Sequence, residues 1–79
     1  MAFSVVMPAL EMAQETGKLV SWRKKEGQSV SKGEPLLEVE TDKAIQEVEC
    51  IANGVLKAIH VQPGQKVAVG TLIATIKVN

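Results

Sequence analysis

The chain has 79 residues with nine basic and nine acidic side chains, so its formal net charge is zero. It is long enough for one small domain, residues 1–79, which would bury only about 60% of the surface that its unfolded form exposes. No apolar run approaches the roughly 20 residues that cross a bilayer, and no basic patch interleaved with aromatic residues indicates nucleic-acid binding. We therefore expect a domain without membrane or nucleic-acid partners. We also expect the isolated domain to be monomeric.

The first segments predict a strand followed by a loop. Residues 3–7 are mostly apolar and include two valines, which is typical of a strand. Pro8 ends it, because proline lacks the backbone donor that a continuing ladder needs. Residues 8–16 then form a loop. We expect Leu10 and Met12 to hold this loop against the core.

Three further segments carry strand signals. Residues 18–24 predict a second strand with Trp22 as a core residue, because no second aromatic side chain stands nearby to form a stacking platform. Residues 35–40 and residues 45–50 both alternate apolar with acidic side chains, which is the period of half-buried strands. Only a short turn fits between these two segments, so they are predicted to form a hairpin.

The predicted turn lies near the middle of the chain. Thr41 and Asp42 supply side-chain oxygens that can bond to local backbone donors, which suits a type I turn, and Lys43 would then point into water. By strict alternation Ile45 should face outward beside the lysine. The inward set would be Ala44, Val48 and Cys50. From these residues alone, Lys43 has two interpretations: a carrier lysine that is acylated with a cofactor, or an ordinary polar turn residue.

A repeat with an offset of 37 residues links the two halves of the chain. Six positions recur: Gly17, Leu19, Gly27, Gln28, Val30 and Gly33 correspond to Gly54, Leu56, Gly64, Gln65, Val67 and Gly70. Glycines that recur at turns indicate positive φ, and the five residues between paired glycines are enough for one very short strand or a bulged crossing. The two copies are expected to pack together, because neither can bury an apolar face alone. The predicted fold is all-β: a flattened barrel or sandwich of two antiparallel sheets with quasi-two-fold symmetry and the lysine far from the termini.

Charge and cysteine content narrow the candidate sites. Residues 34–49 hold six acidic side chains against Lys43 alone, a net charge of −5, which favours partners with basic entrances. Cys50 has no intramolecular partner, so we expect a buried, reduced thiol. His60 has no second histidine, cysteine pair or neighbouring serine, so we expect a surface residue and neither a metal site nor a catalytic triad.

Together these features resemble the lipoyl domain of 2-oxo acid dehydrogenase complexes, over essentially the whole chain. The matching residues are Met7-Pro8, Gly17, residues 25–27, 33–44, 47–49 and 54–56, Pro63-Gly64 and Val69-Gly70. The specific part is Glu-x-Asp-Lys-Ala at residues 40–44, with Gly27 sixteen residues before the lysine and Gly54 eleven after it. Related biotin carrier domains usually have methionine on both sides of the lysine, so the neighbours found here favour lipoate.

The resemblance implies that Lys43 carries lipoic acid through an amide, on a flattened barrel of two four-stranded sheets. It implies a non-catalytic carrier domain in a dihydrolipoyl acyltransferase component. The implied partners are a lipoate ligase or lipoyl transferase, a thiamin-dependent 2-oxo acid decarboxylase, the acyltransferase core and a flavin-dependent dihydrolipoyl dehydrogenase. The implied location is the bacterial cytoplasm or the mitochondrial matrix. Residues 10–17 depart from the usual first loop, which leaves the cognate decarboxylase open.

The residues around the lysine receive separate expectations. We assign Asp42 and Ala44 to turn geometry and recognition, with Thr41 in the same recognition set. Glu40 is expected to guide the ligase or a basic partner surface, and Ile45 is expected to contact a partner. Biotin carriage and an unmodified interaction module remain the alternatives. An intrinsic enzyme is disfavoured, because no acid, base and nucleophile converge in the sequence.

Overall fold

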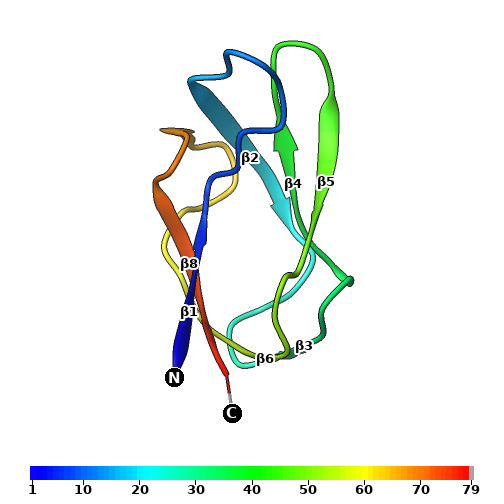
Figure 1. The fold of residues 1–79 in the computed structure, drawn as a ribbon, viewed down its shortest axis with the longest axis vertical. Coiled ribbons are helices and arrows are strands. Elements are labelled where there is room, and N and C mark those ends of the chain that lie inside the picture. Colours follow the sequence, from blue (N-terminus) through cyan, green and yellow to red (C-terminus); the bar gives the residue numbers. More distant parts are fainter. Residues whose placement is uncertain (79) are drawn as a thin grey trace.

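The computed structural model describes residues 1–78, and within them the fold is entirely β (Figure 1). Eight strands in this part of the chain form two four-stranded sheets. The strands are β1 (Ala2–Val6), β2 (Thr16–Trp22), β3 (Ser29–Val30), β4 (Pro35–Glu40), β5 (Ile45–Glu49), β6 (Gly54–Ile59), β7 (Lys66–Ala68) and β8 (Leu72–Lys77). One sheet has the order β1-β8-β6-β3 and the other β5-β4-β2-β7, and neighbouring strands are antiparallel. The predicted fold class is confirmed.

The two copies of the predicted repeat exchange their short strands, so that each short strand pairs with a strand of the other copy. The strands β2, β3 and β4 correspond to β6, β7 and β8, yet β3 pairs with β6 and β7 pairs with β2. The backbone bonds repeat as well, since the amide of Gly27 donates to the carbonyl of Leu56 at 2.7 Å and the amide of Gly64 donates to that of Leu19 at 2.8 Å. Each half therefore completes the sheet of the other.

The six repeated glycines serve two different purposes. Four lie in turns with φ between 89° and 94°: Gly27, Gly33, Gly64 and Gly70. Gly17 and Gly54 lie in strands instead. A β-carbon on Gly54 would overlap the carbonyl oxygen of Lys77, and one on Gly17 would lie 2.6 Å from the sulfur of Met7. The prediction of positive φ is wrong at these two positions, because close packing rather than a turn excludes a side chain there.

The core lies between the two sheets and draws on both of them. The largest fully buried side chains are Met7, Leu19, Leu36, Leu37, Leu56, Ile73, Ile76, Val39 and Cys50. Burial of a side chain of this size contributes about 1.5–3 kcal/mol. Trp22 is half-buried against this core, and its Nε1 donates to the carbonyl of Val61 at 2.9 Å. The expected buried thiol and the core position of Trp22 are confirmed.

The predicted and observed strand boundaries agree best in the middle of the chain. β4 spans the predicted residues 35–40, and β5 ends one residue before the predicted limit. β1 lies one residue earlier than the predicted 3–7, and β2 lies two residues earlier than the predicted 18–24.

The loop between β1 and β2 contains one clear correction. Leu10 packs against the core as expected, but Met12 is 99% exposed. Met12 lies in the middle of a turn that is closed by a hydrogen bond from the amide of Gln14 to the carbonyl of Glu11, at 3.3 Å. This turn directs Met12 away from the core.

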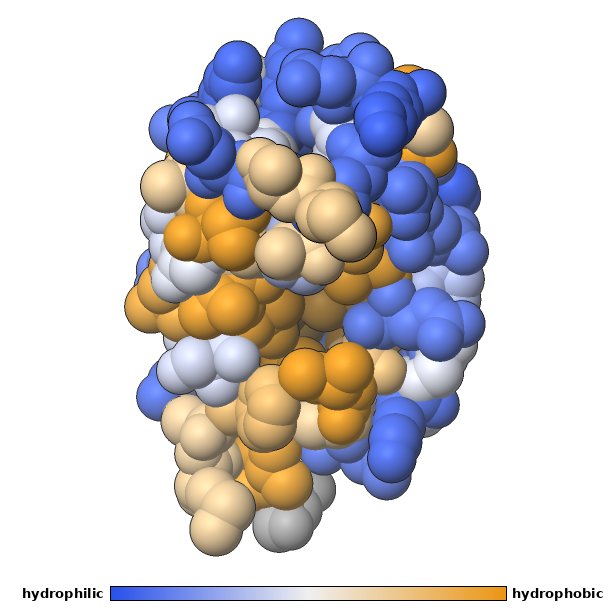
Figure 2. Space-filling model, turned by 45° about the horizontal axis from the view of Figure 1, so that its top comes forward, coloured by the Kyte–Doolittle hydropathy of each residue, from blue (hydrophilic) through white to orange (hydrophobic). Residues whose placement is uncertain are grey.

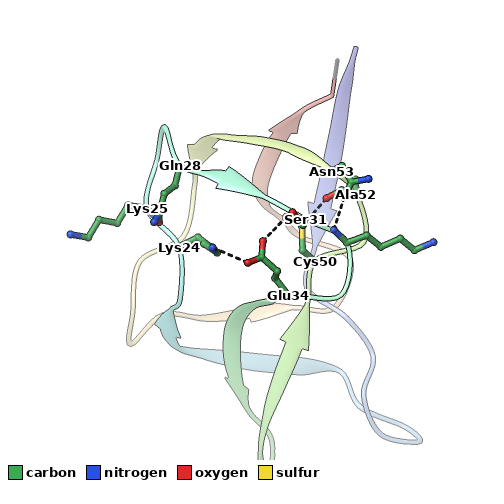
Figure 3. Close-up of polar contacts among 9 residues, drawn as sticks. Lys24, Lys25, Gln28, Ser31, Glu34, Cys50, Ala52 and Asn53 are labelled. Atoms are coloured by element: carbon green, nitrogen blue, oxygen red, sulfur yellow. Dashed lines mark hydrogen bonds and ion pairs between the residues drawn. The ribbon is translucent and has the colours of Figure 1, made fainter.

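Polar contacts stabilise the end of the molecule near the termini, where two donor groups contact the carboxylate of Glu34 (Figure 3). Its Oε1 accepts from the amide of Ser31 at 2.7 Å, and its Oε2 lies 3.2 Å from Lys24 Nζ. These contacts lower the pKa of Glu34, with the Ser31 amide as the larger cause. The Ser21 hydroxyl donates to Glu38 at 2.7 Å and likewise lowers the pKa of that carboxyl.

Stability should fall as acid protonates Glu34 and Glu38. A carboxyl whose pKa in the folded state lies below its usual 4.5 contributes stability that is present above that value and lost as the pH falls through the folded pKa. Urea unfolding should show a free energy of unfolding that declines below about pH 5. Glu34→Gln should weaken this decline. Glu49→Gln is the charge-matched control, and an equal effect in both variants would contradict the assignment.

Candidate functional site

The hairpin between β4 and β5 presents Lys43 at one end of the molecule (Figure 1). The amide of Thr41 donates to the carbonyl of Ala44 at 2.9 Å, so Asp42 and Lys43 are the two residues of the loop. Neither has a positive φ, which excludes types I′, II and II′, so the predicted type I is one of the turn types that remain. Lys43 is exposed, as expected.

The turn side chains form fewer local bonds than predicted. The Thr41 hydroxyl donates to the carbonyl of Ala44 at 3.1 Å instead of accepting from an amide. Within residues 1–78, the carboxylate of Asp42 takes part in no hydrogen bond or ion pair. The turn is therefore closed by its backbone and by Thr41, and the Asp42 carboxylate is available to another molecule.

The strands that support the turn are anchored in the core. Leu37 and Val39 on β4 are fully buried, and β4 lies between β5 and β2 in its sheet. Val48 on β5 packs against the same core. The molecule extends over 35 Å along its longest axis, with the hairpin near one end and both termini at the other, as predicted (Figure 1). The fold thus combines a rigid base with an exposed amine.

A hollow of about 560 Å³ lies beside the hairpin. It is lined by residues 11–18 of the first loop and β2, residues 40–43 of the hairpin, and Lys66 of β7. Figure 2 shows mostly hydrophilic side chains over the upper end of the molecule, where Figure 1 places the hairpin. The surroundings of the lysine are therefore polar, and a partner meets charge there before it meets apolar surface.

Gln14 shapes one wall of this hollow, a role that the sequence analysis missed. Its Oε1 accepts from the amides of Leu10 and Glu11 at 2.7 and 3.1 Å. Its Nε2 donates to the carbonyls of Pro8 and Thr16 at 3.2 and 3.1 Å. One side chain therefore joins both ends of the loop. No motif marks such a glutamine in the sequence, because its partners depend on the path of the loop.

The predicted recognition residues divide into two groups. Glu40, Thr41 and Asp42 line the hollow together with Lys43, whereas Ala44 and Ile45 lie outside it. Ile45 is 56% exposed, which confirms its outward orientation. The inward orientation predicted for Ala44 is wrong, because Ala44 belongs to the turn and is exposed.

The hollow beside Lys43 is lined largely by charged side chains. Four carboxylates and three lysines line the hollow: Glu11, Glu15, Glu40, Asp42, Lys18, Lys43 and Lys66.

His60 is exposed, with Nε2 3.1 Å from Thr75 Oγ1, in agreement with the expected surface position. Residues 1–78 contain no group of three His, Cys, Asp or Glu side chains arranged to hold a metal ion. No helix in residues 1–78 has the length and apolar character needed to cross a membrane.

Comparison with known proteins identifies the family. The model of the biotin/lipoyl family, described as "Biotin-requiring enzyme", matches residues 4–76. The chain is 46% identical over 77 residues to the dihydrolipoyllysine-residue acetyltransferase component of the pyruvate dehydrogenase complex of Rickettsia typhi, covering 96% of this chain and 19% of that protein. It is 44% identical over 71 residues to the mitochondrial pyruvate dehydrogenase protein X component of Mus musculus, covering 89% and 14%. The chain therefore spans less than a fifth of the length of these relatives.

A solved structure agrees with this result. The lipoyl domain of the 2-oxoglutarate dehydrogenase complex of Azotobacter vinelandii matches with a TM-score of 0.74 and 29% identity, covering 94% of this chain and 96% of that domain. The chain therefore belongs to the biotin/lipoyl family of carrier domains. Within that family, its fold and sequence are similar to those of lipoyl domains.

Removal of the Gln14 side chain should loosen the loop beside the lysine. Gln14→Ala leaves the amides of Leu10 and Glu11 without their acceptor, and a typical hydrogen bond contributes about 0.5–1.5 kcal/mol. Amide hydrogen exchange at these two residues should accelerate by about tenfold, while core amides exchange as before. Gln62→Ala, at an exposed glutamine, is the control. Unchanged exchange in Gln14→Ala would show that the loop holds its shape by other contacts.

Proposed function

We propose that this chain is a lipoyl carrier domain in which Lys43 is joined by an amide to lipoic acid. The observation that carries the proposal is the position of Lys43: exposed, in a two-residue turn, on strands fixed in the core and far from the termini. The domain is the non-catalytic part of a 2-oxo acid dehydrogenase complex. It presents the arm, and the enzymes it visits carry out the reactions.

The residues present fit the attached group. Lys43 offers a primary amine that no other side chain of residues 1–78 pairs with, and the open hairpin leaves room for an acyl chain. Lipoate is a carboxylic acid that does not form an amide unaided, so a ligase must supply an activated acyl group and accept the proton that amide formation releases. Amide formation removes the lysine charge, and residues 34–49 then carry −6. When bound, the lipoyl group supplies a disulfide–dithiol pair that accepts acyl groups and electrons.

The partners follow from the carrier role. The domain is loaded by a lipoate ligase or lipoyl transferase and serves a thiamin-dependent 2-oxo acid decarboxylase, a dihydrolipoyl acyltransferase core and a dihydrolipoyl dehydrogenase. Relatives named as acetyltransferase components support a parent chain of that kind, in which residues 1–79 form one carrier domain. A flexible linker would raise the concentration of the arm at each active site to about the mM range. We assign the domain to the bacterial cytoplasm or the mitochondrial matrix.

The residues around Lys43 guide its recognition. Asp42 and Ala44 flank Lys43 in the turn, and Thr41 closes the turn through its two bonds to the carbonyl of Ala44. Glu40 adds negative charge at the rim of the hollow, which suits a basic entrance on the ligase or on another partner. Ile45 offers an exposed apolar contact on β5 beside the turn.

Loading of Lys43 can be tested by intact mass. Incubation with a lipoate ligase, ATP and lipoate should add one lipoyl group to the chain, whereas Lys43→Arg should gain nothing because its guanidinium does not form the amide. Lys32→Arg is the matched control and should be loaded normally. A biotin adduct formed in cells would favour the biotin carrier alternative, and a loaded Lys43→Arg variant would refute the attachment site.

The role of Ile45 requires a separate assay. Ile45→Ser removes an exposed apolar contact beside the lysine, worth about 1 kcal/mol if it is buried on docking. The KM of the loaded domain for reductive acylation by its decarboxylase should therefore rise about fivefold, with loading itself unaffected. Ile51 is similarly exposed, at 58%, and Ile51→Ser is the control. An unchanged KM for Ile45→Ser would show that this side chain contacts no decarboxylase.

A further inference from the structure

A row of exposed side chains crosses the outer face of the sheet that contains the hairpin. The register pairs Ile45 on β5 with Glu40 on β4, and Glu40 with Lys18 on β2. Lys18 is paired in turn with Lys66 on β7. Directly paired residues project to the same face of a sheet, and all four side chains are exposed. The row therefore runs from an apolar residue beside the turn to two adjacent lysines.

The two lysines form an unbalanced pair of charges. Like charges directly opposite each other on neighbouring strands destabilise a sheet. Within residues 1–78, neither Lys18 nor Lys66 forms an ion pair with a carboxylate, although Glu40 lies next to Lys18 in the row. Both lysines also border the hollow that contains Lys43. Repulsion is thus retained at the edge of the functional site.

Another like-charged pair in the same sheet has an opposite charge beside it. Glu38 on β4 is paired directly with Glu47 on β5. Arg23 lies between them, with Nη2 3.2 Å from Glu38 and 3.6 Å from Glu47. A single opposite charge therefore offsets the repulsion of two residues within this chain. In the described part of the chain no carboxylate forms an ion pair with either lysine, although Glu40 lies opposite Lys18.

We infer that Lys18 and Lys66 bind an acidic surface of the enzyme that loads Lys43, an inference that rests on the proposed function. Loading brings the Lys43 amine into the active site of that enzyme, so the surface around the hairpin must meet the enzyme as well. That surface includes the hollow that the three lysines share. A carboxylate of the enzyme then takes the position between Lys18 and Lys66 that Arg23 takes between the two glutamates.

The arrangement of charges around the hollow favours one orientation of the bound enzyme. Acidic residues lie on the hairpin and the first loop, as Glu40, Asp42, Glu11 and Glu15, whereas Lys18 and Lys66 lie on β2 and β7. An enzyme surface with the opposite pattern, basic over the hairpin and acidic over the lysine pair, is attracted in one orientation only. That orientation delivers Lys43 to the active site and keeps the other two lysines engaged.

Loading kinetics test this contact. Lys18→Gln/Lys66→Gln should raise the KM for a lipoate ligase about three- to tenfold at low ionic strength, on the scale of two exposed charge contacts, and should weaken the salt dependence. The kcat and the final adduct mass should stay the same, because Lys43 is unchanged. Lys32→Gln/Lys57→Gln removes the same charge away from the hollow and should behave as the unsubstituted chain.

The outcomes separate this inference from the proposed function. If the unsubstituted chain gains no lipoyl mass, the carrier function is refuted. If it is loaded but the Lys18/Lys66 variant keeps the same KM and salt dependence, or the control variant shifts as much, the docking surface is refuted. The melting temperature of the Lys18/Lys66 variant should be unchanged or higher, since a repulsion is removed. A lower value would assign the lysines a structural role and would also refute the inference.

Discussion

The exchange of β3 and β7 between the two halves is the constraint on which this structure depends. Each repeat is too short to enclose a core, and each sheet is completed by a strand of the other half. Closure brings the backbone of β8 close to Gly54 and the buried side chain of Met7 close to Gly17, so that a β-carbon would collide at both positions. The two sheets therefore form together around one core, and the position of every connection between strands follows from that closure.

The symmetry explains why one hairpin is available for function. Under the approximate two-fold relation, β4 and β5 correspond to β8 and β1. The connection from β4 to β5 is the turn with Lys43, whereas the equivalent place between β8 and β1 holds the chain ends, joined by the bond from the Val78 amide to the Met1 carbonyl at 2.8 Å. A parent chain attached at the termini therefore stays at the opposite end of the long axis from the lysine (Figure 1).

The sequence predicted the features that depend on local period and spacing. The alternation of apolar with acidic residues located β4, and the 37-residue repeat located the segments that form both short strands. The predictions failed where tertiary path decides. Met12 has the composition of a core residue but lies in a turn, and Ala44 continues the strand period but lies beyond the strand. Gln14 and the Lys18–Lys66 pair were not found, because their significance comes from loop path and cross-strand register, which no single segment encodes.

Charge compensation differs between the hairpin end and the rest of the molecule. Glu34 is paired with Lys24, and Glu38 with Arg23, in contacts that favour the charged carboxylates. Around the hollow, Lys18 and Lys66 face each other, and within residues 1–78 neither forms an ion pair with a carboxylate. A sequence selected for stability alone would replace one of these lysines, as it costs little to change an exposed strand residue. Local conflict of this kind concentrates at functional sites, where a partner supplies the missing interaction. The electrostatics of the sheet therefore point to the same end of the molecule as the hairpin geometry does.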